Sequence, residues 1–489
     1  MRYIRPENRA QYVMLNTLDD LVPSEHQVRL IDMVIDQMVN ANPEQFGIEC
    51  DETDPGRPGF APQTMLKLFL YGYLISCRAS RKLETETKRN IELIWLLGTL
   101  SPDHWVIAQY RRVHGDHIKA ATKLFRQFLR DHGYIKGECV AVDGTKLKAN
   151  ARRDMLTAEK IERRLEHLDE QLAEYLDKFA ENDLRDDLAE ELDSLDGNVS
   201  VDCHLADKII ALQKQIEKLT AHKETLASSG KTYLSPTDPE ASLMKTLDGK
   251  VPGYNVQSVV DDAYHMIAAT EVLTEQEDHA ALPRMVEAVQ TELGVTPNEI
   301  TADTGYYTPD LLQQVETITG ATCYVPPPEK DEHASPMTFH YDASTDSYTC
   351  SAGRVLVLHQ KNKRKNNSLA NVYRGTQCAD CHLRAQCTTS KQGRIVHRYH
   401  NQHWRDRFRE RMAQASSKAV IGLRKCLVEH PLGTIKLWGG KLPLLLRGVP
   451  KVTIEINLYA TAYNLRRLLN CTTSQTLTDH VASYSWKLA

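Results

Sequence analysis

The chain has 489 residues, of which 41 % are hydrophobic and 26 % are charged, a balance typical of folded globular proteins rather than disordered or membrane-embedded chains. This length predicts two or three domains. The sequence contains no run of 18 apolar residues, and its N-terminus lacks the apolar core of a signal peptide, so we expect a cytoplasmic protein. Eleven cysteines, odd in number and mostly isolated, argue against the disulfide framework of a small secreted domain.

The net charge of −5 is the sum of segments with opposite charge. Residues 154–229 hold 20 acidic and 9 basic side chains, a net charge of −11, so the rest of the chain sums to +6. Residues 354–411 hold 14 basic and 3 acidic side chains, a net charge of +11. The negative total therefore does not exclude contact with nucleic acid, because local basic patches still attract phosphates.

Residues 1–135 are predicted to form a helical domain. Apolar residues recur at helical spacing in LVPSEHQVRLIDMVIDQMV, TMLKLFLYGYLI and NIELIWLLG. GRPGF predicts a loop before the second of these helices, and SPDH predicts the cap of the helix that runs through Tyr110. The basic residues near these helices are Arg78, Arg81, Lys82, Arg111 and Arg112. Such residues usually mark a solvated face, and the alternative is a helix-turn-helix reader of DNA.

A second domain, residues 136–489, is predicted to begin where the pattern changes. GECVAVDGT has the alternation and β-branched content of a buried strand that ends in a turn at Asp143. Residues 154–232 then carry apolar heptads with Glu and Lys between them, which predicts an inserted helical, coiled-coil-like hairpin. An antiparallel helical pair packing on itself is enough to explain these heptads, and a dimerisation arm is the alternative.

An α/β sheet with mixed strand directions is predicted after this insertion. YNVQSVVDD and HMIAATEVL indicate a strand hairpin around Asp261 and Asp262, followed by a helix over 279–293. NEITADTGYY indicates a strand that ends at Asp303, TPDLLQQVETI a helix capped by Thr308, and ATCYVPP a further strand. Residues at the strand ends of such a sheet line a cleft.

The C-terminal part of the chain begins with a second insertion. Residues 326–400 interrupt the α/β pattern with Pro, polar and basic residues and with separated cysteines. Helices are predicted over 402–436 and 453–470, and the polar tail after residue 471 carries no informative pattern.

Three acidic residues are candidates for metal-dependent phosphodiester cleavage, which needs carboxylates that converge on two divalent ions. Asp143 and Asp303 each stand where a strand ends in a small-residue turn, which leaves the carboxylate at an open sheet edge. Either aspartate alone is more often a turn former, but two such strands in one domain favour a shared site. Glu429 lies on a predicted helix about two turns before Lys436, and this pair is either a metal and phosphate ligand set or a surface ion pair.

Successive phrases of the sequence resemble the landmarks of DDE-type transposases of bacterial insertion sequences. In the second domain these phrases are VDGTKLKANA, SPTDPEA, PGYNVQSVVDD, ADTGYY and VEHPLGTIK. In the first domain they are VPSEHQVRLID, GRPGFAPQTMLKLFLYGYL, the stretch 78–83 and PDHWVIAQYRR. The match is collinear over residues 14–470 and implies a ribonuclease-H-like catalytic core behind a helical N-terminal transposase domain.

The resemblance implies an enzyme that nicks the ends of its mobile element and joins the freed 3′ hydroxyls to target DNA, with no covalent protein intermediate. It assigns the three acids to Asp143, Asp303 and Glu429, which would hold two Mg²⁺ ions, with Mn²⁺ able to substitute. The implied partners are the terminal repeats and target DNA, bound by a homodimer or higher oligomer, so the expected location is the nucleoid. The alternatives are a plain nuclease on the same core and a domesticated, catalytically silent DNA-binding protein, which usually lacks one of the acids.

Related transposases extend the last acid into a Tyr, Arg, Glu, Lys motif, which this chain keeps only in part. Glu429 and Lys436 match, but Gly422 replaces the Tyr and Lys425 replaces the Arg, with Arg424 adjacent. A contact of that Tyr with the transposon end is therefore not carried over, while Arg424, Lys425 and Lys436 are expected to hold DNA phosphates.

The cysteines of the second insertion form a candidate metal group: Cys350, Cys378, Cys381 and Cys387. They include one CxxC pair, and four thiolates can close a structural zinc site. Reduced, unligated thiols are the alternative, and His397, His400 and His403 offer replacement ligands.

Basic residues around this insertion are candidates for holding transposon DNA near the acids. They are Lys361, Lys363, Arg364, Lys365, Arg405, Arg407, Arg409 and Arg411, the last four interleaved with Trp404 and Phe408. We expect Arg405 and Arg409 to contact DNA, and a solvated loop is the alternative interpretation.

Overall fold

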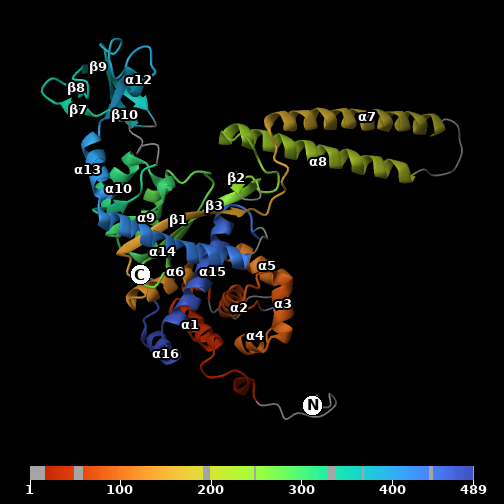
Figure 1. Cartoon of the computed structure of the whole chain (residues 1–489). Coiled ribbons are helices and arrows are strands. Elements are labelled where there is room, and N and C mark those ends of the chain that lie inside the picture. The colour runs from red at the N-terminus through yellow and green to blue at the C-terminus, as the bar shows by residue number, and fades with distance from the viewer. Residues whose placement is uncertain are drawn as a thin grey trace, which may run out of the picture.

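The computed structural model describes residues 17–48, 59–190, 199–246, 249–328, 337–365, 368–439 and 444–487. It consists of a body of helices around one sheet, a long helical arm, and a second small sheet at the opposite end from the N-terminal helices (Figure 1). The predicted mixed α/β architecture with a helical N-terminal region is confirmed. Within the described ranges, no helix is both long and apolar enough to cross a membrane.

The predicted N-terminal helices are present. They are η1 (Leu18–Leu21), α1 (Gln27–Ala41), η2 (Glu44–Phe46), α2 (Pro62–Leu74), α3 (Ser80–Arg89), α4 (Ile91–Leu96), α5 (His104–Val113) and α6 (Gly115–Asp131). Helix α2 is buried from Met65 to Leu74 because α1 and α15 (Val449–Cys471) pack against it. Asp103 caps α5 as predicted, since its carboxylate accepts the N–H of Val106 at 2.8 Å. Most of the predicted GRPGF loop lies outside the described residues.

Two of the basic residues expected on a solvated face are instead buried against α15. Arg78 Nη1 donates to Glu455 Oε1 at 3.0 Å, and Arg111 Nη1 donates to the carbonyl of Arg78 at 3.0 Å. The other oxygen of the fully buried Glu455 accepts the N–H groups of Leu445 at 2.8 Å and Leu446 at 3.2 Å. The prediction was wrong for Arg78 and Arg111 because a carboxylate inside a core needs cationic partners. We call these five residues the Glu455 network.

The central sheet contains the predicted strands β1 (Cys139–Lys148), β3 (Gly249–Asp261), β4 (Ile267–Leu273), β5 (Glu299–Thr301) and β6 (Thr322–Tyr324). It also contains β2 (Ser242–Thr246), which the sequence did not predict. Its order is β2-β3-β1-β5-β6, and β4 also pairs with β3. Strands β2, β3 and β4 pair antiparallel to their neighbours, whereas β1, β5 and β6 run parallel. The predicted hairpin around Asp261 and Asp262 and the mixed strand directions are thus confirmed.

Helices pack around this sheet as the periodicity predicted, with two differences. The elements are α9 (Ala281–Leu293), η3 (Thr304–Tyr306), α10 (Pro309–Thr319), α13 (Gln402–Ala413), α14 (Ala415–Gly439), α15 and α16 (Ser474–Ser483). The single helix expected over 402–436 is divided at Gln414. Thr308 precedes α10, but its hydroxyl donates to the carbonyl of His279 at 3.1 Å instead of capping the helix. The tail after 471 forms α16, and Trp486 is buried behind it.

The predicted helical insertion is an antiparallel pair that projects from the body as an arm (Figure 1). It consists of α7 (Ala158–Glu190) and α8 (Val199–Ser229), which contact each other along their length. Ile161 and Leu226 are buried between the helices near the body. The arm closes at its base, where Leu156 and Leu234 exchange both backbone hydrogen bonds at 2.8 and 2.9 Å.

The second insertion contains a sheet that the sequence did not predict. Strands β7 (Phe339–Asp342), β8 (Ser347–Cys350), β9 (Val355–Lys365), β10 (Ser368–Gly375) and β11 (Ile395–Tyr399) pair antiparallel in the order β11-β10-β9-β8-β7, and the short helix α12 is Arg384–Cys387. Tyr348, Leu356 and Tyr373 form its small core. The basic and polar residues that suggested an irregular segment lie between the few apolar positions that this core needs.

Candidate functional site

The structure brings the first two candidate acids to the same edge of the central sheet. Strands β1 and β5 are parallel, and Ala141 pairs with Thr301. Asp143 and Asp303 each follow this pair, the last between the two strands, by two residues. Asp303 lies just after β5, whereas Asp143 lies inside β1, which continues to Lys148 in its pairing with β3. The prediction that the first strand ends at Asp143 was therefore wrong. The negative charge of Asp303 acts on Asp143. Both acids therefore lie at the point where the pairing of β1 with β5 ends.

Each of these aspartates is fixed by the N–H of a glycine that follows it. Asp143 Oδ1 accepts the N–H of Gly144 at 2.8 Å. Asp303 caps η3, and its Oδ1 accepts the N–H of Gly305 at 2.8 Å. The backbone thus holds one oxygen of each carboxylate in place, although only Asp303 begins a turn and Asp143 and Gly144 belong to β1.

Burial raises the pKa of Asp143 above its usual value. The Gly144 N–H and the guanidinium of Arg424 oppose this shift, whereas the charges of Asp303 and Asp278 add to it. Arg424 Nη1 lies 3.4 Å from Asp143 Oδ2. The charges of two further carboxylates and one guanidinium therefore act on Asp143.

The third of these carboxylates, Asp278, was missed in the sequence. It lies in the loop between β4 and α9, and its Oδ1 accepts the side-chain amides of Asn255 and Gln257, each at 2.7 Å. Asp278 carries no signal of the kind that identified the other two acids, because it follows the end of β4 by five residues and has no glycine beside it. In the sequence it stands in TEQEDH beside Glu275 and Glu277, which are exposed.

The amides that hold Asp278 belong to a buried polar group on β3. Asn255 and Gln257 are fully buried, and Gln257 Nε2 also donates to Asn255 Oδ1 at 3.0 Å. The hydroxyl of the buried Tyr306 donates to Gln257 Oε1. Buried polar side chains must be hydrogen-bonded, and the amides of Asn255 and Gln257 find their acceptor in the partly exposed Asp278.

The third predicted acid, Glu429, is not brought to the two aspartates. It lies five residues after Arg424 on α14, which corresponds to about 7.5 Å along the helix axis. Its side chain is exposed, as are those of Lys425 and Lys436. Of the two basic residues considered for the Arg of the family motif, Arg424 faces the acids and Lys425 faces solvent.

No group of three or more His, Cys, Asp or Glu side chains is arranged to hold a metal ion within the part of the chain that the structure describes. Magnesium is nevertheless commonly bound through one or two carboxylates, with water and substrate phosphate completing its six ligands. Asp143 and Asp303 are carboxylates of the required kind, one on β1 and the other just after the neighbouring strand β5.

The four candidate zinc ligands are brought to one small cavity in the second sheet: Cys350, Cys378, Cys381 and Cys387. Burial raises the pKa of Cys387, and the other three cysteines raise it further against the opposing charge of Arg394. The N–H of Arg394 donates to Cys378 Sγ at 3.5 Å. The separated positions in sequence thus come together in space.

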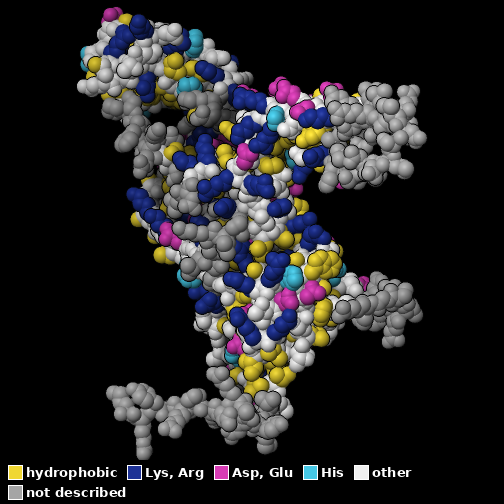
Figure 2. Space-filling model, turned by 90° about the vertical axis from the view of Figure 1, so that its right-hand side faces the viewer, with side chains coloured by type: hydrophobic (Ala, Val, Ile, Leu, Met, Phe, Trp, Pro, Cys, Tyr) yellow, Lys and Arg dark blue, Asp and Glu magenta, His cyan; other side chains and the backbone are white. Residues whose placement is uncertain are grey.

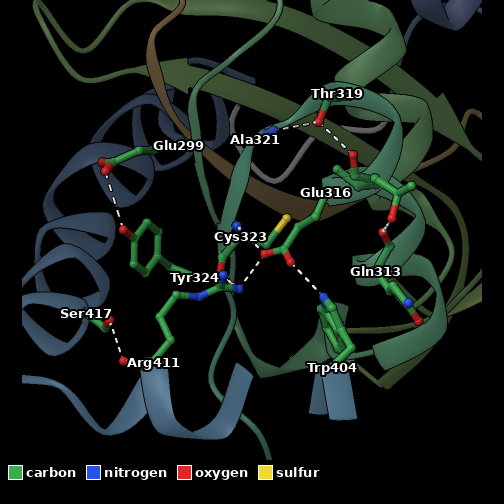
Figure 3. Close-up of polar contacts among 12 residues, drawn as sticks. Glu299, Gln313, Glu316, Thr319, Ala321, Cys323, Tyr324, Trp404, Arg411 and Ser417 are labelled. Carbon is green, nitrogen blue, oxygen red and sulfur yellow. Dashed lines mark hydrogen bonds and ion pairs between the residues drawn. The ribbon is translucent and has the colours of Figure 1, made fainter. Parts of the chain in front are cut away.

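Several aromatic and basic residues of α13 are bound to the protein itself (Figure 3). Glu316 on α10 accepts hydrogen bonds from Arg411 and from Trp404 Nε1, the latter at 2.8 Å. It also accepts the N–H of Cys323 at 3.0 Å. Arg411 and Trp404 therefore anchor α13 to α10 and β6.

The two residues of α13 expected to contact DNA differ in exposure. The side chain of Arg405 is 13 % exposed, pairs with Asp310 at 3.1 Å and stacks over the ring of Tyr399. The side chain of Arg409 is 65 % exposed and reaches Asp406 at 3.4 Å. Lys and Arg side chains are spread over the body on the face shown in Figure 2.

Two protein families match parts of this chain. Residues 349–469 match the transposase DDE domain, and residues 16–113 match a transposase domain named DUF772. No curated protein matches the chain. Among solved structures, a chain of the piggyBac transposase synaptic complex with hairpin DNA is similar at 11 % identity, with 94 % of this chain and 85 % of that chain covered and a TM-score of 0.24.

Both matched families are transposase families, so this chain is a DNA transposase, an enzyme that cuts and joins DNA. It is a DDE-type transposase of an insertion sequence, as its resemblance in sequence indicated. The DDE match includes the cysteine group, Glu429 and Lys436 but begins after Asp143 and Asp303. The family match therefore assigns no role to Asp143 or Asp303, and their roles are inferred from their positions in the fold.

Proposed function

We propose that this transposase cleaves the ends of its insertion sequence with divalent metal ions, normally two Mg²⁺, held by Asp143, Asp303 and Glu429. The observation that carries the proposal is the meeting of Asp143 on β1 with Asp303 after β5, each two residues beyond the last pair of these parallel strands. The freed 3′ hydroxyls would then attack target DNA. Glu429 is included because the DDE-domain match covers it and because its exposed side chain would meet DNA bound over the two aspartates.

We further propose that residues 136–489 form a ribonuclease-H-like catalytic domain behind a helical domain of residues 1–135. Support comes from the order of the main strands, in which an antiparallel hairpin (β3 and β4) flanks β1 and two parallel strands (β5 and β6) follow on its other side. In this arrangement the first acid stands on the first strand and the second at the end of its parallel neighbour. The helical arm and the small sheet are then insertions in that domain.

The chemistry of the site fits a divalent cation. Asp143, Asp303 and Asp278 bring three negative charges against the single charge of Arg424, which leaves a net charge of −2 when all three are ionised. Thr145, two residues along β1, has a buried hydroxyl oxygen with no hydrogen-bond partner among the described residues. Bound Mg²⁺ would polarise the phosphate and activate water or a 3′ hydroxyl. The protein's part is to hold the carboxylate oxygens, which the glycine N–H groups already orient.

Exposed basic side chains are the best candidates for DNA contacts. Lys425, Lys436 and Arg409 point to solvent and are available to phosphates. Arg424 and Arg405 already pair with Asp143 and Asp310, so in our proposal they act on DNA only by exchanging these partners.

We propose that the cysteine group binds structural zinc, with the four thiolates closing around the ion. Their shared cavity and the N–H bond to Cys378 support this assignment, since thiolate ligands commonly accept backbone N–H groups. The measurement is the zinc content of the purified chain compared with C381S. About one zinc per chain in the wild type and its loss in C381S is the expected result, and a zinc-free wild type would contradict the assignment.

Cleavage and joining of DNA that carries the element's own ends tests the catalytic proposal. We expect Mg²⁺-dependent nicking and strand-transfer products for the wild type, and neither for D143A, D303A or E429A, although all three still bind the ends. Nicking without strand transfer would indicate a plain nuclease. Full activity in any one variant would remove that residue from the metal site.

A further inference from the structure

Asp278 stands between the two predicted metal ligands. A Cβ atom added to Gly144 would lie 3.1 Å from Asp278 Oδ1, and one added to Gly305 would lie 3.8 Å from Asp278 Oδ2. These are the same glycines whose N–H groups hold Asp143 and Asp303. Asp278 therefore lies close to both glycines, at the positions where other residues would carry a side chain.

The two oxygens of Asp278 have different surroundings. Oδ1 accepts both amides of the buried pair Asn255 and Gln257. Oδ2 has no hydrogen-bond donor among the described residues. Charge-assisted hydrogen bonds to one oxygen fix the direction of the carboxylate and leave the other oxygen as a free acceptor.

Folding alone does not explain why the polar side chains behind Asp278 are buried, because burying a polar group costs free energy. Asn255 and Gln257 are buried on β3, and the buried Tyr306 of η3 bonds to Gln257, so that a partly exposed loop carboxylate is held at two points. Apolar residues at these strand positions would bury more area without any need for hydrogen bonds. Groups that orient a ligand from behind are typical of metal sites.

We propose that Asp278 is a further metal ligand of this transposase, presented by Asn255 and Gln257 between Asp143 and Asp303. The inference rests on the proposed function, because it assumes that Asp143 and Asp303 bind the ion. It adds a carboxylate that lies at the site, in contrast to Glu429, and it places the ion next to the two glycines.

Mn²⁺ binding to the full-length chain without DNA, measured by calorimetry and by electron paramagnetic resonance, tests the proposal. The D278N variant keeps an oxygen that accepts both amides, so the buried group stays satisfied. We expect D278N to lower the Mn²⁺ affinity at least about tenfold, in the range found when groups around metal sites are changed. The matched control is E277Q, whose carboxylate is adjacent in sequence but 81 % exposed, and which should bind as the wild type does.

The same titration separates failure of this inference from failure of the proposed function. Wild-type affinity in folded D278N, together with weak binding in D143N and D303N, would overturn the role of Asp278 alone. Wild-type affinity in all three variants would overturn the metal site itself. A merely structural Asp278 would lower the melting temperature of D278N without changing its Mn²⁺ affinity.

A second measurement uses the unaltered protein, in case D278N does not fold. Fe²⁺ with ascorbate and peroxide generates hydroxyl radicals that cut the backbone close to the bound ion. We expect cuts near residues 143, 278 and 303, all suppressed by excess Mg²⁺. Cuts near 143 and 303 without one near 278 would overturn the inference.

Discussion

Glu455 and Asp143 are both acidic side chains inside the protein, but their surroundings differ. The carboxylate of Glu455 has the cation Arg78 at 3.0 Å and two backbone N–H groups on its other oxygen, so its charge is compensated from all sides. Asp143 has one guanidinium at 3.4 Å and lies beside two further carboxylates. Complete compensation indicates a structural role, whereas excess negative charge at a strand edge indicates a place for a cation.

The largest effect should come from D143N, which removes one charge from the edge where negative charge is in excess. We expect DNA cleavage to fall by about 10³-fold or more, because a metal ligand is lost. The melting temperature should stay constant or rise, because the change removes a buried charge that Asp303 and Asp278 repel. Gel assays of cleavage and a thermal melt on the same preparation measure both. A large fall in the melting temperature would show that Asp143 is a structural residue like Glu455.

The opposite result is expected for E455Q. Removing one partner of a buried ion pair leaves Arg78 uncompensated and typically costs about 3–5 kcal/mol. Urea unfolding should therefore shift strongly, while cleavage by the molecules that remain folded should change little. The control is E174Q, which breaks an exposed pair with Lys178 on the arm and should leave the unfolding curve in place. An unchanged unfolding curve for E455Q would contradict our account of the network.

A smaller change at the acidic edge is G144A. The new methyl group would overlap the side-chain nitrogen of Gln257 and crowd Asp278. We expect a tenfold or greater loss of Mn²⁺ affinity with a modest loss of stability. The matched control is G433A on α14, where an added Cβ meets nothing within 4 Å, and where alanine should stabilise the helix by about 0.5–1 kcal/mol. Equal effects of the two substitutions would contradict the proposed crowding.

Glu316 offers a third kind of buried acid, one that joins two elements. In E316Q the hydrogen bonds to Arg411 and Trp404 are weakened, and we expect a loss of about 1–3 kcal/mol in stability. Hydrogen exchange should become faster in α13 first. E410Q, an exposed change on the same helix, is the control. If the backbone amides of α13 exchange at the same rate in the wild type and in E316Q, Glu316 does not anchor this helix.

The smallest effect is expected from K425A on the exposed side of α14. If Lys425 contacts one phosphate, its loss should make the slope of log K for DNA binding against log salt concentration shallower by about one. The sequence preference should not change. K178A on the arm is the control, since Lys178 pairs with Glu174 far from the acids. Identical salt slopes for K425A and wild type would exclude that contact.

Local patterns were enough to predict the parts of the site that depend on neighbours in sequence. Asp143 and Asp303 each come after a short apolar run and are followed within two residues by a glycine, so the same short signal identified both. The strand end that this signal predicted at Asp143 was wrong, because pairing with β3 extends β1 to Lys148. Asp278 depends on Asn255 and Gln257, which look like ordinary polar residues of a strand until the loop folds over them.

Contacts between distant segments explain the other differences. The burial of Arg78 is decided by Glu455, a residue 377 positions away. The small sheet was missed because basic residues occupy most positions of β9 after Leu358, while its core needs only a few apolar side chains. The family match likewise found Glu429 without its geometry, which the folded chain sets apart from the two aspartates.

The closed base of the arm also has a consequence for how this protein can be altered. Because Leu156 and Leu234 bond to each other, the chain leaves the body and returns to it at one point. Everything between them is a cassette whose removal requires only a short connection and no rearrangement of β1 or β3. Lineages can therefore lengthen, shorten or exchange this segment, and an engineer can replace it with a reporter domain, while the order of the strands that carry the acids stays the same.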